Sequence, residues 1–175
     1  MRNPAAALLI AAALTLLLPW PLTAQQPAGS IDPPPGSRVL LQVTGEGAQI
    51  YTCSTTQDGV KWVLKAPDAR LLDSAGKVIG RHFAGPTWQL SEGGKIKGQV
   101  QGELVASKPS PDSGSAAWLL LRAKAGSGSL ARVAFIRRSQ TSGGAAPASG
   151  CAAPSDAGKS DRVPYTAAYT FYSAP

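Results

Sequence analysis

The chain has 175 residues, of which 43% are hydrophobic and 15% charged, and its formal net charge at pH 7 is +7. One histidine and two cysteines are too few for a zinc site made from several such ligands. A chain of this length folds as one domain and builds its core without a metal ion.

The first 24 residues have the pattern of an export signal. Residues 1–3 carry a positive charge, residues 4–18 are uncharged and mostly alanine and leucine, and the segment ends at the small residue Ala24. This order is typical of a cleaved signal peptide. The apolar run is shorter than the roughly 20 residues of a membrane span. We therefore expect cleavage after Ala24, a periplasmic or secreted protein, and no transmembrane segment in the mature chain.

Residues 25–37, QQPAGSIDPPPGS, are rich in proline, glycine and serine. Three consecutive prolines at 33–35 favour an extended polyproline conformation. This segment is predicted to be a leader, and the folded domain is predicted to span residues 38–175.

From residue 38 onward, apolar residues alternate with polar ones. In residues 95–104, one face carries Ile96, Gly98, Val100, Gly102 and Leu104. In residues 162–172, one face carries Tyr165, Ala167, Tyr169 and Phe171. A period of two predicts half-buried β-strands. Residues 116–123 are continuously apolar and predict a central strand that is covered on both faces.

Turn signals separate these runs, at residues 58–59, 73–76, 92–94 and 126–128. No amphipathic helix is predicted after the signal. Short strands punctuated in this way predict a single all-β domain, either an antiparallel sandwich or a barrel. The alternation does not distinguish the two architectures.

Residues 139–163 form a long segment of glycine, alanine, serine and proline between two predicted strands. Cys151 lies near its middle, and the other cysteine is Cys53. Exported chains meet oxidising conditions, so we expect one disulfide between Cys53 and Cys151 that holds this loop against the sheet.

Most motifs of known chemistry are missing. Neither a G-x-S-x-G nucleophile elbow nor a P-loop occurs. Residues 126–131, GSGSLA, fit a dinucleotide fingerprint, but a strand-like run follows where that motif needs a helix, so a hairpin loop is predicted. The cations are spread along the chain, and Arg137 and Arg138 should point to opposite faces of one strand. We expect no cofactor, no metal and no nucleic-acid partner.

The only histidine, His82, lies in the segment RHFAGPTWQL at residues 81–90, close to Trp88. Alternation puts His82 on one strand face and its neighbours Arg81 and Phe83 on the other. His82 is therefore a candidate for ligand binding or catalysis, with a structural hydrogen-bonding role as the alternative. Trp62 and Trp118 lie in core-patterned runs, whereas Trp88 and Tyr51 are candidates to line a ligand site.

Several motifs occur together in one order: GAQIYTC at 47–53, APDARLLDSAGKVIGRHFAGPTW at 66–88, AWLLLRA at 117–123, VAFIRRSQTSGGAAP at 133–147, Cys151 and RVPYTAAYTFY at 162–172. This set resembles domain-of-unknown-function family 3455, a family of secreted bacterial and fungal proteins. The resemblance implies a one-domain exported β protein with the Cys53–Cys151 pair. It implies no activity.

Three functions remain open. The favoured one is a non-enzymatic binding module of the envelope or extracellular space, with His82, Trp88 and Tyr51 lining a site for a small molecule or glycan. The second is a small hydrolase- or isomerase-like enzyme in which His82 acts as general acid/base with a nearby carboxylate or Lys95. The third is a structural protein whose positive charge attaches it to an anionic envelope polymer.

Overall fold

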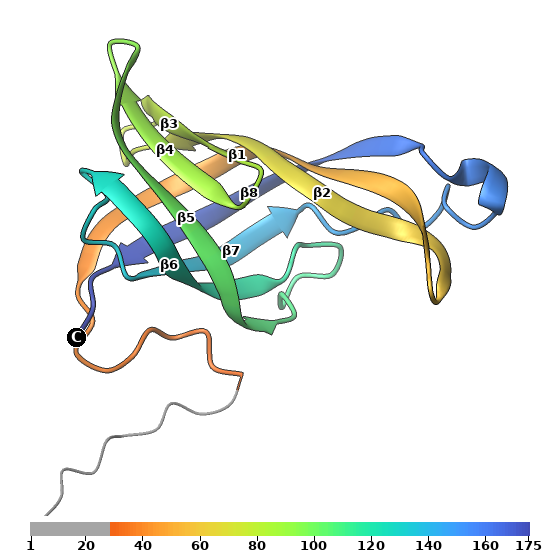
Figure 1. Ribbon diagram of the computed structural model, residues 1–175, viewed down its shortest axis with the longest axis horizontal. Helices are drawn as coiled ribbons and strands as arrows, with labels where there is room; N and C mark the ends of the chain where they lie inside the picture. The colour runs from red at the N-terminus through yellow and green to blue at the C-terminus, as the bar shows by residue number, and fades with distance from the viewer. Residues whose placement is uncertain (1–28) are drawn as a thin grey trace, which may run out of the picture.

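The computed structural model describes residues 29–175, so the predicted signal peptide lies outside the described residues. The domain is all-β, as predicted, and its strands close into a barrel (Figure 1). The strands are β1 (Val39–Thr56), β2 (Gly59–Leu72), β3 (Val78–Phe83), β4 (Thr87–Glu92), β5 (Lys95–Lys108), β6 (Trp118–Gly128), β7 (Phe135–Gly143) and β8 (Ser160–Tyr172). A single turn of 3-10 helix, η1 (Pro154–Asp156), precedes β8. Within residues 29–175, no helix has the length and hydropathy to cross a membrane.

Every strand pairs antiparallel with the next one in the chain, and β8 returns to pair with β1. This order needs only short connections, such as the turn at Gly93 and Gly94, where both residues have positive φ and a side chain would be strained. Closure gives every strand a partner on both sides over at least part of its length. Closure therefore answers the choice between sandwich and barrel that the alternation leaves open.

The interior of the barrel contains the faces predicted from the period of two. In β8, Tyr165, Ala167, Tyr169 and Phe171 are each at most 3% exposed. They pack in a core whose other buried members are Val43, Ala69, Leu71, Trp88, Val100, Leu121, Leu130, Val133 and Ile136. Leu130 and Val133 come from the connection between β6 and β7, so this core fills the end of the barrel where that connection lies.

The segment 29–37 lies against the outside of the barrel. Ile31 is buried, and the Asp32 carboxylate forms an ion pair of 3.1 Å with the Arg137 guanidinium on β7. Leu120, on the outward face of β6, is also buried, whereas its neighbour Leu121 belongs to the core inside. The prediction that the apolar run in β6 is covered on both faces is therefore confirmed.

Three details differ from the sequence predictions. Residues 139–143 and 160–163 belong to strands, so the long loop is confined to residues 144–159. The glycines at 126–128 continue β6, and the turn follows at residues 129–132. Trp62 and Trp118 are only partly buried and lie outside the core. Trp62 belongs to the part of β2 that extends past the barrel, and Trp118 lies on the outward face of β6, beside Ile31 and Lys108.

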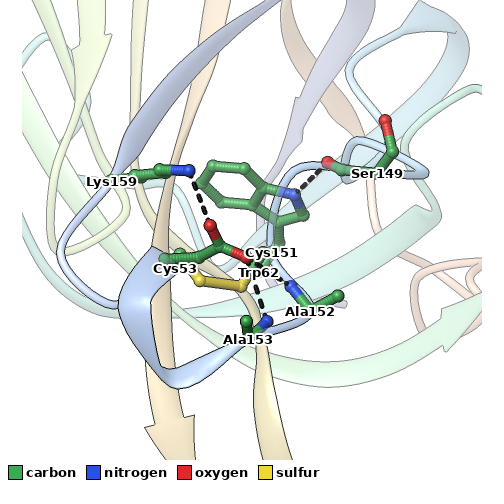
Figure 2. A network of polar contacts seen from close by, with 8 residues as sticks. Cys53, Trp62, Ser149, Cys151, Ala152, Ala153 and Lys159 are labelled. Carbon is green, nitrogen blue, oxygen red and sulfur yellow. Dashed lines mark hydrogen bonds and ion pairs between the residues drawn. A yellow bond between two sulfur atoms is a disulfide. The ribbon is translucent and has the colours of Figure 1, made fainter.

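The β1–β2 hairpin extends past the barrel, and the 144–159 loop folds against it (Figure 1). The predicted disulfide between Cys53 and Cys151 is present and joins the two (Figure 2). Beside it, the Trp62 indole donates a hydrogen bond of 2.8 Å to the Ser149 carbonyl. Asp156 accepts bonds from the backbone of Ala152 and Ala153, which fixes the loop as a small structured unit.

Candidate functional site

A cavity of about 330 Å³ opens at the end of the barrel opposite the filled core. We call it the barrel-mouth cavity. Its apolar wall includes Leu64, Trp88, Leu104, Leu119 and Leu121, and its polar wall includes Gln49, His82, Arg138 and Tyr169. All eight strands contribute to these two sets, because their inward faces converge at the barrel mouth.

His82 and Trp88 are direct partners across the β3–β4 pair, so their side chains lie on the same face of the sheet. Their rings stack with centroids 4.2 Å apart and planes inclined by 9°. Tyr169 from β8 packs edge-on against both rings. These three side chains form a rigid aromatic wall on one side of the cavity.

The imidazole of His82 is only 3% exposed, and its one hydrogen bond within residues 29–175 joins Nδ1 to the Thr87 carbonyl oxygen at 2.9 Å. A carbonyl only accepts, so Nδ1 carries the proton. Burial lowers the pKa of His82 to about 3, and the positive charge of Arg138 adds to this effect against the opposing bond to Thr87. The ring is therefore neutral at physiological pH, and its Nε2 is a hydrogen-bond acceptor on a side chain that lines the cavity.

Gln49 contributes an unusual group to the same wall. Its side chain is 1% exposed, and neither the amide oxygen nor the amide nitrogen has a hydrogen-bond partner among residues 29–175. Buried amides are nearly always hydrogen-bonded, and an unsatisfied one costs about 1–3 kcal/mol. Gln49 lines the cavity from the inward face of β1, and its amide lies buried in the wall, between the strand partners Pro67 and Val163.

Arg138 brings the positive charge. It faces inward on β7 between Leu119 of β6 and Tyr169 of β8, whereas Arg137 points outward to Asp32. The opposite directions predicted for these two arginines are thus confirmed. The pairing of β7 shifts register directly after this point, and Gln140 has a φ of 50° there. Such irregularities re-aim a strand next to functional sites.

The residues singled out from the sequence separate into two groups. His82 and Trp88 line the barrel-mouth cavity together. Tyr51 does not line it, because its hydroxyl donates to the Gly144 carbonyl at 2.8 Å beneath the 144–159 loop. Lys95 begins β5 at the opposite end of the barrel from the cavity, so it is not brought near His82. Glu103 lies at the exposed rim.

Sequence reasoning missed Gln49, Arg138 and Tyr169 as site residues. The alternation of β7 does contain a signal, since Arg138 shares its face with the fully buried Ile136. A charged residue on an apolar strand face indicates a buried functional group. The convergence of Gln49 with it has no such local signal.

A larger depression of about 780 Å³ lies outside the barrel mouth, along β1, β2 and the neighbouring strands. It is open, and its charged groups already have partners: Glu46 pairs with Arg70, and Asp68 with Arg162. Among the described residues that line it, no polar side chain is both buried and without a hydrogen bond, so the barrel-mouth cavity is the stronger candidate. No group of three or more potential metal ligands occurs in residues 29–175.

Comparison with known proteins found one family. The model of the family described as "Protein of unknown function (DUF3455)" matches residues 33–173. No curated protein and no solved structure matches the chain.

Proposed function

Because the chain belongs to the DUF3455 family, whose description assigns no activity, we propose a function from the site itself: the protein is exported and binds a small molecule in the barrel-mouth cavity. The proposal fits the general design of ligand sites, which are concave, mainly apolar and fitted with a few convergent polar groups. The volume of about 330 Å³ suits a compact ligand.

The observation that carries the proposal is the amide of Gln49. An amide with two unused hydrogen-bonding atoms, 1% exposed in a cavity wall, destabilises the fold unless something binds to it. Nearby, Nε2 of His82 also has no hydrogen-bond partner among the described residues. A ligand with both a donor and an acceptor satisfies these groups.

The geometry gives little support to the enzymatic alternative. A general acid or base works best when its pKa is close to the working pH, and burial lowers the pKa of His82 to about 3. The ring is also fixed by its bond to Thr87 and by its stack on Trp88. Glu103 forms no hydrogen bond with it. His82 is placed to hold and orient a ligand.

The structural alternative rests on positive charge alone. Among residues 29–175, six cationic side chains form ion pairs with carboxylates: Lys61, Arg70, Lys97, Arg137, Lys159 and Arg162. These pairs are spread over several strands, which does not favour one cationic face for a polymer.

Native mass spectrometry of the mature protein, purified from its own export compartment, tests the proposal. A bound mass of low molecular weight is expected with the wild type and is expected to be lost in Gln49→Leu and His82→Ala. The matched control is Gln89→Leu, since Gln89 is also buried but lies on the outer face of β4 with its amide bonded to Arg81 and Gln99. An unliganded wild type, with no mass acquired from an extract of that compartment, would contradict the proposal. The same spectrum gives the mature N-terminus, and a mass that starts after Ala24 supports export.

A further inference from the structure

Arg138 is a buried cation for which the described residues provide no counter-charge. We propose that the ligand of the barrel-mouth cavity is a carboxylate with an apolar body, and that the guanidinium of Arg138 binds its head group. This inference rests on the proposed binding function and specifies the chemical class of the ligand.

The guanidinium of Arg138 uses only some of its hydrogen-bond donors within the protein. Nε and Nη2 of Arg138 donate to the Ala117 carbonyl oxygen, at 3.0 and 2.7 Å, and the positive charge lies close enough to Tyr169 to act on its hydroxyl. A guanidinium has more N–H groups than these contacts use. The backbone carbonyl fixes the plane of the group, and the remaining donors are left for a ligand.

The positive charge of Arg138 is buried without an ionic partner among the described residues. Arg138 is 7% exposed, and none of the ion pairs among residues 29–175 includes it. Its positive charge acts on four titratable side chains, those of His82, Tyr51, Tyr165 and Tyr169. Burial lowers the pKa of the histidine and raises the pKa of the three tyrosines, so all four are neutral at pH 7. A buried charge without a partner is unfavourable, and an anionic ligand would remove that cost.

The net charge of the barrel-mouth cavity indicates the charge of its ligand. At the rim of the cavity, Lys65 and Glu103 are both exposed and have opposite charges. The interior therefore holds one net positive charge, which a monoanion balances. The planar fork of a guanidinium matches the two oxygens of a carboxylate. The unsatisfied amide of Gln49, buried in the same wall, would supply a further donor once its side chain turns toward the ligand.

The apolar wall of the barrel-mouth cavity indicates an apolar body for the ligand. Trp88 and Leu121 are at most 3% exposed deep in the cavity, while Leu64 and Leu104 at the rim are 46% and 58% exposed. An apolar chain that runs from Arg138 toward the rim would cover these leucines. A molecule with an anionic head and an apolar body therefore satisfies both walls at once.

Isothermal titration of the mature protein with octanoate, 1-octanol and octyltrimethylammonium tests the head group, since the three probes share one alkyl chain. We expect octanoate to bind roughly 10- to 100-fold more tightly than octanol, the difference expected for hydrogen bonds to a charged group, and the cation to bind least. Arg138→Met is expected to remove the preference for octanoate and to leave octanol binding within about twofold, because the apolar wall is intact.

The matched control is Arg137→Met, the same substitution one residue away on the outer face of β7. It is expected to bind all three probes as the wild type does, and near-UV circular dichroism verifies that both variants are folded. If the wild type binds octanoate and octanol equally, or if Arg138→Met keeps the preference, the carboxylate is wrong while the binding function stands. If the folded wild type binds none of the three probes, the apolar carboxylate is wrong, and the native mass spectrum decides the binding function separately.

Discussion

The imidazole of His82 lies flat on the indole of Trp88, with ring centroids 4.2 Å apart and planes inclined by 9°. The stack follows from the register of β3 and β4, which makes the two residues direct partners on the inward face. Because Nδ1 of His82 is bonded to Thr87, the ring cannot turn, and its other nitrogen is held toward the cavity. The stack therefore serves both the fold and the proposed site.

His82 makes the stability of the protein depend on pH. Its pKa is about 3 in the folded state and about 6.5 in the unfolded chain, so the unfolded state binds the proton first as pH falls. The free energy of unfolding should be highest above pH 6.5 and should fall by about 1.4 kcal/mol per pH unit below it. Urea unfolding between pH 7 and pH 4.5 measures this slope.

The control is His82→Asn, whose amide can replace the Nδ1 bond and does not titrate. Since His82 is the only histidine in the chain, this variant should lose the slope above pH 4.5, where carboxylates contribute little. The lowered pKa of Asp156, caused mainly by its hydrogen bond to Lys159, acts only at lower pH. An equal slope in both proteins would show that the folded pKa of His82 is not lowered.

Two buried glutamines should respond to the same substitution in opposite directions. Gln49→Leu removes an unsatisfied amide, so the ligand-free protein should become more stable by about 1–3 kcal/mol and lose its ligand. Gln89→Leu breaks the bonds to Arg81 and Gln99 and should destabilise the protein by about 1–2 kcal/mol without affecting binding. Denaturant unfolding of the ligand-free variants measures both changes. A loss of stability in Gln49→Leu would mean that its amide has partners in solution.

Tyr51 is expected to support the loop and to have no role in the site. Tyr51→Phe removes the bond to the Gly144 carbonyl and should cost about 1–2 kcal/mol of stability. Ligand affinity should stay within about twofold, because this side chain does not line the cavity. Binding and unfolding of the same variant are measured side by side, and a loss of affinity larger than the loss of stability would return Tyr51 to the site.

The disulfide closes a long loop, since Cys53 and Cys151 are 98 positions apart. Replacing both cysteines with alanine should lower the free energy of unfolding by about 4–5 kcal/mol, according to the loop-entropy model. Hydrogen exchange should also accelerate at the Trp62 indole N–H, which the 144–159 loop protects through Ser149. The Trp88 backbone amide in the barrel serves as the internal reference, and equal acceleration at both positions would show that the loop is not held separately.

The amino-acid sequence alone determined the local features of the fold. Alternation in residues 162–172 identifies the inward face of β8, and the two cysteines identify the disulfide, because both depend on local periodicity or on simple pairing. The same reasoning showed that Arg137 and Arg138 point in opposite directions. Boundaries were less accurate, since the glycine-rich ends of β6 and β7 resemble loops in composition and are strands only because a neighbouring strand pairs with them.

Only the tertiary structure decided that the sheet closes, and closure is what creates the site. A period of two assigns a residue to a face, but it does not show whether that face meets a filled core or a cavity. Gln49, His82 and Arg138 lie on β1, β3 and β7 and meet only because the barrel brings distant strands around one opening. Tyr51 has the same inward direction as Gln49, yet it lies two residues beyond the mouth, where the 144–159 loop covers it. The position along the barrel axis separates a site residue from a structural one, and strand pairing alone sets that position.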